Sequence, residues 1–267
     1  MKKRLSAPAV VLVALGLLAG CENTKDMDES LPSSVVTVPD NLTEEDGSAE
    51  RAEADEAVTA GTETYRQFVL DNVLHSDTEG DIHYNLYVPE DDGTDTPYAL
   101  FVTLPGYEGL YFQGVGGNLR SEDFAFEAQK YKDHMIVAAP QLEDWGETSA
   151  RKTVALTEYL LEQYSIDRDQ VYINGYSGGG ETLSLVLDEN PGLYTAALMC
   201  SSRWDGGYEN VTRARTPVYF VIGESDEYYG AEPFRSAYEE IRSRYEAEGF
   251  SEADIADLVT LDVKPAS

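Results

Sequence analysis

Val171-Tyr172-Ile173-Asn174-Gly175-Tyr176-Ser177-Gly178-Gly179 is the stretch of sequence that decides the fold. Its first part is a β-prone run that predicts a strand, and the residues from Gly179 to Leu187 predict a helix. The G-x-S-x-G turn between them requires glycine where two backbones crowd together. We therefore expect the Ser177 hydroxyl to stand at the carboxyl edge of a sheet, above a helix N-terminus that favours negative charge.

Strand and helix patterns alternate on both sides of this turn, from Thr64 to Val263. Apolar or alternating runs predict strands at 81–88, 98–104, 135–139, 170–174, 195–200, 217–222 and 259–263. Helical periodicity predicts helices at 122–131, with Ser121 as the N-cap, and at 150–164, 179–187, 237–248 and 252–258. This alternation predicts an α/β protein with a doubly wound, mostly parallel sheet, which binds ligands beyond the carboxyl ends of its strands.

The N-terminus carries an export signal. Met1-Lys2-Lys3-Arg4 is basic, the apolar run that follows is too short to span a membrane, and residues 1–20 therefore predict a signal peptide. Leu18-Ala19-Gly20-Cys21 resembles the lipobox of bacterial lipoproteins, which implies that Cys21 is lipidated and anchors the chain to the outer face of a bacterial cell membrane. The alternative is an ordinary signal peptide that ends beside a cysteine.

The composition is strongly acidic, with 19 Lys and Arg against 50 Asp and Glu, a formal net charge of −31 over 267 residues. Such a chain repels phosphate backbones, so nucleic-acid binding is excluded. Residues 21–62 are acidic and lack sustained periodicity, which predicts a disordered linker before a folded domain at 63–267. Cys200, the only other cysteine, lies in an apolar run and is expected to pack in the core.

Two backbone amides are candidates for an oxyanion hole. One is the amide of Gly178, directly after the candidate nucleophile, and the other is the amide of Tyr107 in the Pro105-Gly106-Tyr107 loop that follows an early strand. The candidate acid is Asp226, in the turn after strand 217–222, with Glu224 and Glu227 as alternatives.

The general base is harder to place. His75, His83 and His134 all precede Ser177, whereas a hydrolase elbow calls for a histidine after the acid. We expect that the sequence stops short of the C-terminal histidine loop and the last helix. The alternatives are that one of the three histidines replaces the missing base, or that the protein binds ligands without catalysis.

Aromatic residues recur on the loops that follow the predicted strands. Trp145, Trp204, Tyr228 and Tyr229 are candidates to line a substrate cleft that stacks an aryl or sugar group. No cofactor motif and no metal-ligand motif is predicted, and the sequence does not indicate an oligomeric state.

Four segments together resemble bacterial secreted α/β-hydrolases, a group that includes prolyl-oligopeptidase-type peptidases, polyhydroxybutyrate depolymerases and feruloyl-esterase-like enzymes. They are 104–109, 141–148, 175–181 and 223–230. The resemblance implies an α/β-hydrolase fold and hydrolysis of an ester or amide through an acyl-enzyme, with Ser177 as nucleophile and Asp226 as triad acid. The expected function is a carboxylester hydrolase acting on a small or polymeric ester such as an acylated polysaccharide. The alternatives are a serine peptidase and a non-catalytic surface lipoprotein.

Overall fold

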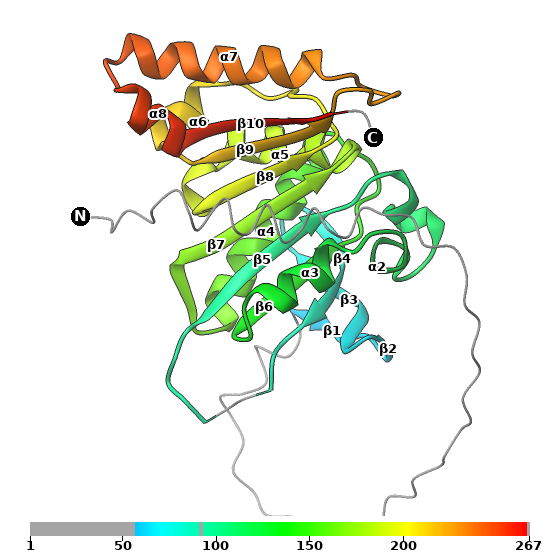
Figure 1. Cartoon of the computed structure of the whole chain (residues 1–267). Coiled ribbons are helices and arrows are strands. Elements are labelled where there is room, and N and C mark those ends of the chain that lie inside the picture. The colour runs from blue at the N-terminus through cyan, green and yellow to red at the C-terminus, as the bar shows by residue number, and fades with distance from the viewer. Residues whose placement is uncertain (1–56, 91–92, 266–267) are drawn as a thin grey trace, which may run out of the picture.

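A ten-stranded sheet forms the centre of the molecule in the computed structural model, which describes residues 57–90 and 93–265. The strands follow the order β1-β3-β4-β6-β5-β7-β8-β9-β10, and β2 pairs with β3 (Figure 1). The predicted signal peptide, Cys21 and most of the predicted linker lie outside the described residues.

Six neighbouring strands run parallel and occupy the predicted apolar runs. They are β5 (Tyr98–Leu104), β6 (Met135–Pro140), β7 (Ile166–Tyr176), β8 (Ala196–Cys200), β9 (Val218–Gly223) and β10 (Val259–Lys264). Strands buried on both faces read as near-continuous hydrophobic runs, which is why the sequence located them well. The expected α/β arrangement with a doubly wound, mostly parallel sheet is confirmed.

The N-terminal strands are antiparallel and were largely missed. They are β1 (Val58–Thr59), β2 (Glu63–Tyr65), β3 (Phe68–Ser76) and β4 (Gly80–Tyr87), of which only β4 was predicted. Ordered structure thus begins before residue 63, inside the segment assigned to the linker, because Val58 and Thr59 pair with β3. A two-residue strand carries no periodicity. In β3, buried and half-buried residues alternate from Phe68 to Leu74, but Asn72 takes one of the buried positions and Val69 and Val73 take half-buried ones, so the sequence itself shows no clear alternation.

Helices cover both faces of the sheet (Figure 1). They are α2 (Gly117–Ser121), α3 (Phe124–Tyr131), α4 (Glu147–Gln163), α5 (Gly178–Glu189), α6 (Glu209–Ala214), α7 (Glu232–Ala247) and α8 (Glu252–Leu258), with short 3₁₀ turns at Tyr107–Gly109, Tyr111–Gln113 and Pro191–Leu193. Apolar residues of α3 pack on one face of the sheet, and those of α4, α5 and α7 pack on the other.

The helix predicted at 122–131 begins later than predicted. The segment 122–131 does not begin a helix at an N-cap of Ser121, because Ser121 ends α2 and Glu122 is extended, with φ −139°. A helix therefore starts only at Phe124, and Glu122 is left in the break between α2 and α3. Cys200 is buried in the core, as expected.

Candidate functional site

Ser177 occupies the turn between β7 and α5, at the carboxyl edge of the parallel strands. Its φ of 53° and ψ of −126° lie in a region that residues with a Cβ rarely adopt. The Ser177 amide donates to the Cys200 carbonyl at 3.0 Å, and the Ser177 carbonyl accepts from the Gly180 amide at 2.9 Å. The strain is thus held by the neighbouring strand and by the first turn of the helix.

Glycines on either side of Ser177 allow this turn to fit. A Cβ on Gly175 would lie 2.3 Å from the Gly179 carbonyl oxygen, and a Cβ on Gly179 would lie 2.3 Å from the Leu104 carbonyl oxygen. Such contacts are far shorter than van der Waals distances, so β7, α5 and the end of β5 approach one another only because these side chains are absent.

The predicted oxyanion loop lies against the nucleophile. A Cβ on Gly106 would be 3.2 Å from the Cβ of Ser177, so the step that leads into Tyr107 borders the serine. Neither the Tyr107 amide nor the Gly178 amide donates a hydrogen bond to another described residue. These two donors are therefore available to a ligand oxygen, as an oxyanion hole requires.

Glu122 supports this loop, and no pattern in the sequence predicts its role. The Gly106 amide donates to Glu122 Oε1 at 2.7 Å. Burial raises the pKa of the Glu122 carboxyl to about 8; the Gly106 hydrogen bond lowers the pKa and the charge of Glu108 raises it, but burial dominates. No motif in the sequence includes Glu122. Its role becomes visible only in the structure, where it lies between α2 and α3 and accepts from the Gly106 amide.

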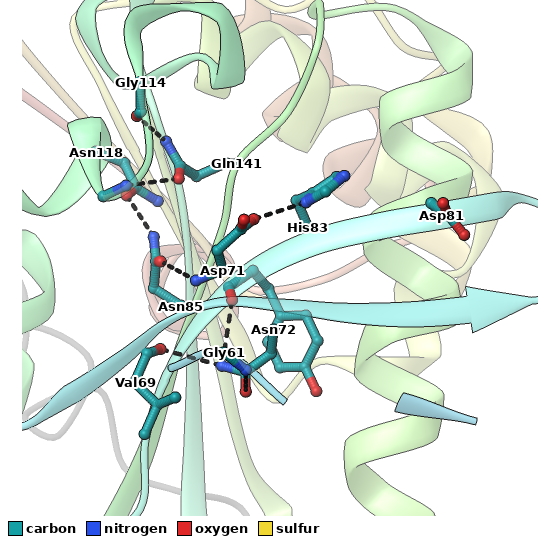
Figure 2. A network of polar contacts seen from close by, with 12 residues as sticks. Gly61, Val69, Asp71, Asn72, Asp81, His83, Asn85, Gly114, Asn118 and Gln141 are labelled. Atoms are coloured by element: carbon teal, nitrogen blue, oxygen red, sulfur yellow. Dashed lines mark hydrogen bonds and ion pairs between the residues drawn. The ribbon is translucent and has the colours of Figure 1, made fainter. Parts of the chain in front are cut away.

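A buried amide network holds the far end of the same loop (Figure 2). Gln141 Oε1 accepts from the Gly116 amide at 2.8 Å, and Gln141 Nε2 donates to the Gly114 carbonyl at 3.1 Å. Asn118 Oδ1 accepts from Asn85 Nδ2 at 2.8 Å, which ties the loop to β4. Satisfied buried polar groups of this kind fix one loop conformation.

Trp145 closes one side of the site. A Cβ on Gly178 would lie 2.2 Å from Trp145 Cε2, so the indole packs directly on the glycine after the nucleophile. Trp145 Nε1 is buried and has no hydrogen-bond partner within the described ranges. The Tyr107 ring lies 6.2 Å from the Trp145 ring and 5.5 Å from that of Phe112. Tyr107 and Phe112 are 57% and 62% exposed, so an aromatic surface continues outward from Trp145.

Asp226 lies in the turn after β9 and organises the loop that faces Ser177. Its Oδ1 accepts from the amides of Tyr228 at 3.1 Å and Tyr229 at 2.8 Å. The Tyr229 hydroxyl donates to Glu181 Oε1 at 2.7 Å, and Glu181 lies in the first turn of α5, the helix that Ser177 caps. Sequence analysis placed Tyr229 in the cleft but missed Glu181, although its position four residues after Ser177 puts it one helical turn along the same face.

The other aromatic candidates diverge. Tyr228 is 85% exposed beside Tyr229, where a ligand can reach it. Trp204 does not line an open cleft: it packs in the core, stacks on Tyr208 at 5.3 Å, and donates its indole N–H to the Gly206 carbonyl at 2.8 Å. Trp204 does follow β8, as predicted, but its loop folds toward the core, and the indole N–H is hydrogen-bonded within that loop.

The three histidines all make contacts away from Ser177. His75 Nδ1 pairs with Asp81 Oδ1 at 2.8 Å, and His83 Nδ1 pairs with Asp71 Oδ1 at 2.7 Å (Figure 2 shows the second pair). His134, which precedes β6, bonds the Thr96 carbonyl at 2.7 Å at the opposite edge of the sheet. None of these contacts supplies the Ser177 hydroxyl with a base.

Two further observations bound the chemistry of the described region. No cluster of three or more His, Cys, Asp or Glu residues in it could hold a metal ion. None of its helices combines the length and the apolar character needed to cross a membrane.

Comparison with known proteins agrees with this geometry. Residues 140–228, which include the Ser177 turn and Asp226, match the Prolyl oligopeptidase family. No curated protein matches the chain. The resemblance to α/β-hydrolases stated from the four segments is thus confirmed for the fold.

Solved structures of esterases and peptidases share the fold. A thermostable esterase is similar with a TM-score of 0.60 and 23% identity over 75% of this chain, which spans 55% of the esterase. A putative dipeptidyl aminopeptidase IV from Bacteroides ovatus is similar with a TM-score of 0.55 and 15% identity. The match covers 76% of this chain and 33% of that protein. A ferulic acid esterase from the anaerobic fungus Anaeromyces mucronatus is similar with a TM-score of 0.53 and 16% identity. The match covers 79% of this chain and 85% of the esterase.

Proposed function

We propose that the protein is a serine hydrolase that cleaves a carboxylic ester through an acyl-enzyme on Ser177. The observation that carries the proposal is the backbone of Ser177, held at φ 53° between β7 and α5 with the Gly106 step against its side chain. Strain of this kind costs about 1–3 kcal/mol and persists mainly at functional sites. A bystander serine in a tight turn has no need of it.

The chemistry follows from the groups around Ser177. The serine oxygen attacks the ester carbonyl, and the developing negative charge is received by the amides of Gly178 and Tyr107 and by the N-terminus of α5. Asp226 stands at the position of a triad acid and would orient a histidine base. Its observed contacts are the amides of Tyr228 and Tyr229.

The substrate class is suggested by the rim of the site. Tyr107 and Phe112 lie on one side and Tyr228 on the other, all largely exposed. Aromatic rings stack on sugar or aryl groups. We propose an ester of an acylated polysaccharide as the substrate.

A fluorophosphonate probe tests the nucleophile directly. We expect covalent labelling of the full chain at Ser177, seen as one modified peptide by mass spectrometry, and no labelling of Ser177→Ala. Hydrolysis of p-nitrophenyl acetate and release of acetate from acetylated xylan should be lost in the same variant. A folded wild-type chain that resists the probe but binds xylan-derived oligosaccharides would contradict this proposal and favour a non-catalytic binder.

A serine peptidase is the second candidate, because the matched family is that of prolyl oligopeptidase. A series of proline-containing p-nitroanilide peptides distinguishes the peptidase from the esterase. The ester proposal expects kcat/KM for p-nitrophenyl acetate to exceed that for every peptide, and the reverse order would establish the peptidase.

We also propose that the enzyme works at the cell surface, anchored through lipid on Cys21. This rests on the sequence Leu18-Ala19-Gly20-Cys21. Expressed in a bacterium, the wild type should sediment with membranes and incorporate labelled palmitate, whereas Cys21→Ser should do neither. Equal fractionation of both forms would refute the anchor.

A further inference from the structure

Hydrogen bonds hold Gly106 on both sides and so decide where the next backbone amide points. The Gly106 carbonyl accepts from the Gly109 amide at 3.1 Å, and the Gly106 amide donates to Glu122 Oε1 at 2.7 Å. The Gly106 carbonyl and the Tyr107 amide belong to one planar peptide group, in which they point in opposite directions. The two hydrogen bonds therefore set the direction of the Tyr107 amide, one of the two candidate oxyanion donors.

The Glu122 carboxyl lies close to the nucleophile as well as to the loop. A Cβ on Gly106 would be 3.3 Å from Glu122 Oε1 and 3.2 Å from the Cβ of Ser177. The carboxyl and the nucleophile thus flank the same small residue. A negative charge on Glu122 would oppose an oxyanion that forms at this place, because like charges at such short range repel strongly inside a protein.

The space around the Glu122 carboxyl leaves little room for the solvation of a charge. A cavity of about 10 Å³ borders the carboxyl and is lined also by Thr103 and Asn118. A cavity of this size holds one water molecule at most. A carboxyl that is poorly hydrated and lacks a cationic partner is more stable as the neutral acid.

No cation of the described residues pairs with Glu122. The charged side chains of α2 and of the start of α3 have other partners: Arg120 donates to the Val115 carbonyl, Asp123 pairs with Arg66, and Lys130 pairs with Glu127. The 3₁₀ turn at Tyr107–Gly109 brings the like charge of Glu108 toward the carboxyl. From β7 comes the phenol of Tyr176, whose Cδ1 would lie 3.1 Å from a Cβ on Gly106.

We propose that Glu122 is a positioning residue of the oxyanion hole, which orients the Tyr107 amide as a neutral acid and disables the hole when it ionises. This inference rests on the esterase proposed above and concerns the same site. Glu122 touches no reacting atom and acts through Gly106. Its neutral carboxyl accepts from the Gly106 amide without adding charge, whereas the carboxylate places a negative charge beside the developing oxyanion.

The direction of the pH dependence follows from the same surroundings. Burial raises the pKa of the Glu122 carboxyl to about 8; the Gly106 hydrogen bond lowers the pKa and the charge of Glu108 raises it, but burial dominates. Below that pH the carboxyl is neutral and the oxyanion hole is competent. As pH rises through about 8 the carboxyl loses its proton to the solvent, and the hydrolysis rate falls.

Steady-state hydrolysis of p-nitrophenyl acetate by the full chain tests this, with Ser177→Ala as the blank at each pH. Between about pH 7 and about pH 9.5, the wild-type kcat should fall at least about 10-fold. KM should change by less than about two-fold, because the oxyanion exists only in the transition state. Glu122→Gln keeps an acceptor for Gly106 and does not ionise, so its kcat should not show this fall.

Removal of the acceptor tests the positioning role at one pH. At about pH 7, Glu122→Ala should lower kcat by about 10–100-fold with little change in KM, less than the about 10²–10³-fold that loss of an oxyanion donor costs. Rescue by Glu122→Gln, which restores the hydrogen bond, separates this effect from a general disturbance of the fold. Circular dichroism at each pH identifies unfolding.

Two further variants make the same chemical change elsewhere. Glu240→Gln alters a glutamate of α7 that pairs with Arg244, and it should keep the wild-type pH profile. Glu108→Gln removes a charge that raises the pKa of Glu122, so the fall in kcat should move to lower pH.

The outcomes separate this proposal from that of the esterase. If the wild type hydrolyses the ester and a folded Glu122→Gln shows the same fall in kcat, Glu122 is not the group that ionises, and the esterase assignment stands. A folded Glu122→Ala with wild-type kcat would likewise overturn the positioning role alone. If the folded wild type does not hydrolyse the ester and is not labelled at Ser177, both proposals are wrong.

Discussion

At the scale of single residues, the site is defined by backbone strain and by the groups that relieve or use it. The sequence predicted the position of Ser177 because close backbone contacts require glycine at Gly175 and Gly179. These glycines appear in the sequence as the G-x-S-x-G pattern. It did not predict Glu122, since one glutamate in an acidic protein is indistinguishable from its neighbours until the fold buries it.

Glycine at position 177 should relieve the strain. Ser177→Gly and Ser177→Ala both remove the hydroxyl, but only alanine keeps the Cβ that opposes a φ of 53°. Glycine is more flexible than alanine in the unfolded chain, which lowers the stability of the glycine variant, but the relief of backbone strain in the native state is larger. We therefore expect the glycine variant to be more stable than the alanine variant by about 1 kcal/mol. Urea unfolding measures the difference, and an alanine variant of equal or greater stability would contradict it.

Glu122 should make the free energy of unfolding depend on pH. Burial raises its pKa in the native state to about 8, above the ordinary value of 4.5. The native state therefore binds a proton that the unfolded state has lost, and stability declines as pH rises from about 4.5 to about 8.

Glu122→Gln tests this linkage because it removes the titration and keeps an acceptor for the Gly106 amide. Its stability relative to the wild type should increase by about 4 kcal/mol between pH 5 and pH 8.5 and then level off. Urea titrations at half-unit pH intervals provide the measurement. A difference between variant and wild type that is constant across this range would show that Glu122 does not titrate there.

At the scale of elements, the loop between β5 and α2 is the part of the site that depends most on tertiary contacts. Its ends are held by Glu122 and by the network around Gln141. Apolar runs predicted β5 to β10 because buried parallel strands need them, whereas the loop is fixed by partners such as Asn85 that lie far away in sequence. The antiparallel β1 and β2 are short and half-exposed, which explains why they left no signal.

Removal of the Gln141 amide should loosen this loop. Gln141→Met keeps the length of the side chain but leaves the Gly116 amide and the Gly114 carbonyl without their partner. Buried groups left unsatisfied cost about 1–3 kcal/mol each, so we expect a loss of about 2–3 kcal/mol and faster hydrogen exchange at residues 106–117.

Gln129→Met provides the matched control, because within the described ranges Gln129 Nε2 has no hydrogen-bond partner to lose. It should leave both the unfolding midpoint and the exchange of the loop close to those of the wild type. Equal losses in the two variants would show that the Gln141 hydrogen bonds do not order the loop.

At the scale of the whole molecule, the net charge of −31 opposes the compact state. Salt screens such repulsion, since the Debye length falls from about 30 Å at 0.01 M to about 10 Å at 0.1 M. We expect the Tm to rise by several degrees between 0.01 and 0.5 M NaCl, and KCl to act equally. Calorimetry checks this, and an unchanged or falling Tm would contradict it.

The indole of Trp145 packed on Gly178 has a spectroscopic consequence. The chain has two tryptophans, and Trp204 is enclosed in the core, where a ligand at Ser177 does not touch it. A Trp204→Phe variant would therefore carry a single fluorophore, which reports on the glycine next to the nucleophile. Acylation of Ser177 would shift or quench its emission in real time, so that the formation and decay of the covalent intermediate could be followed without a chromogenic substrate.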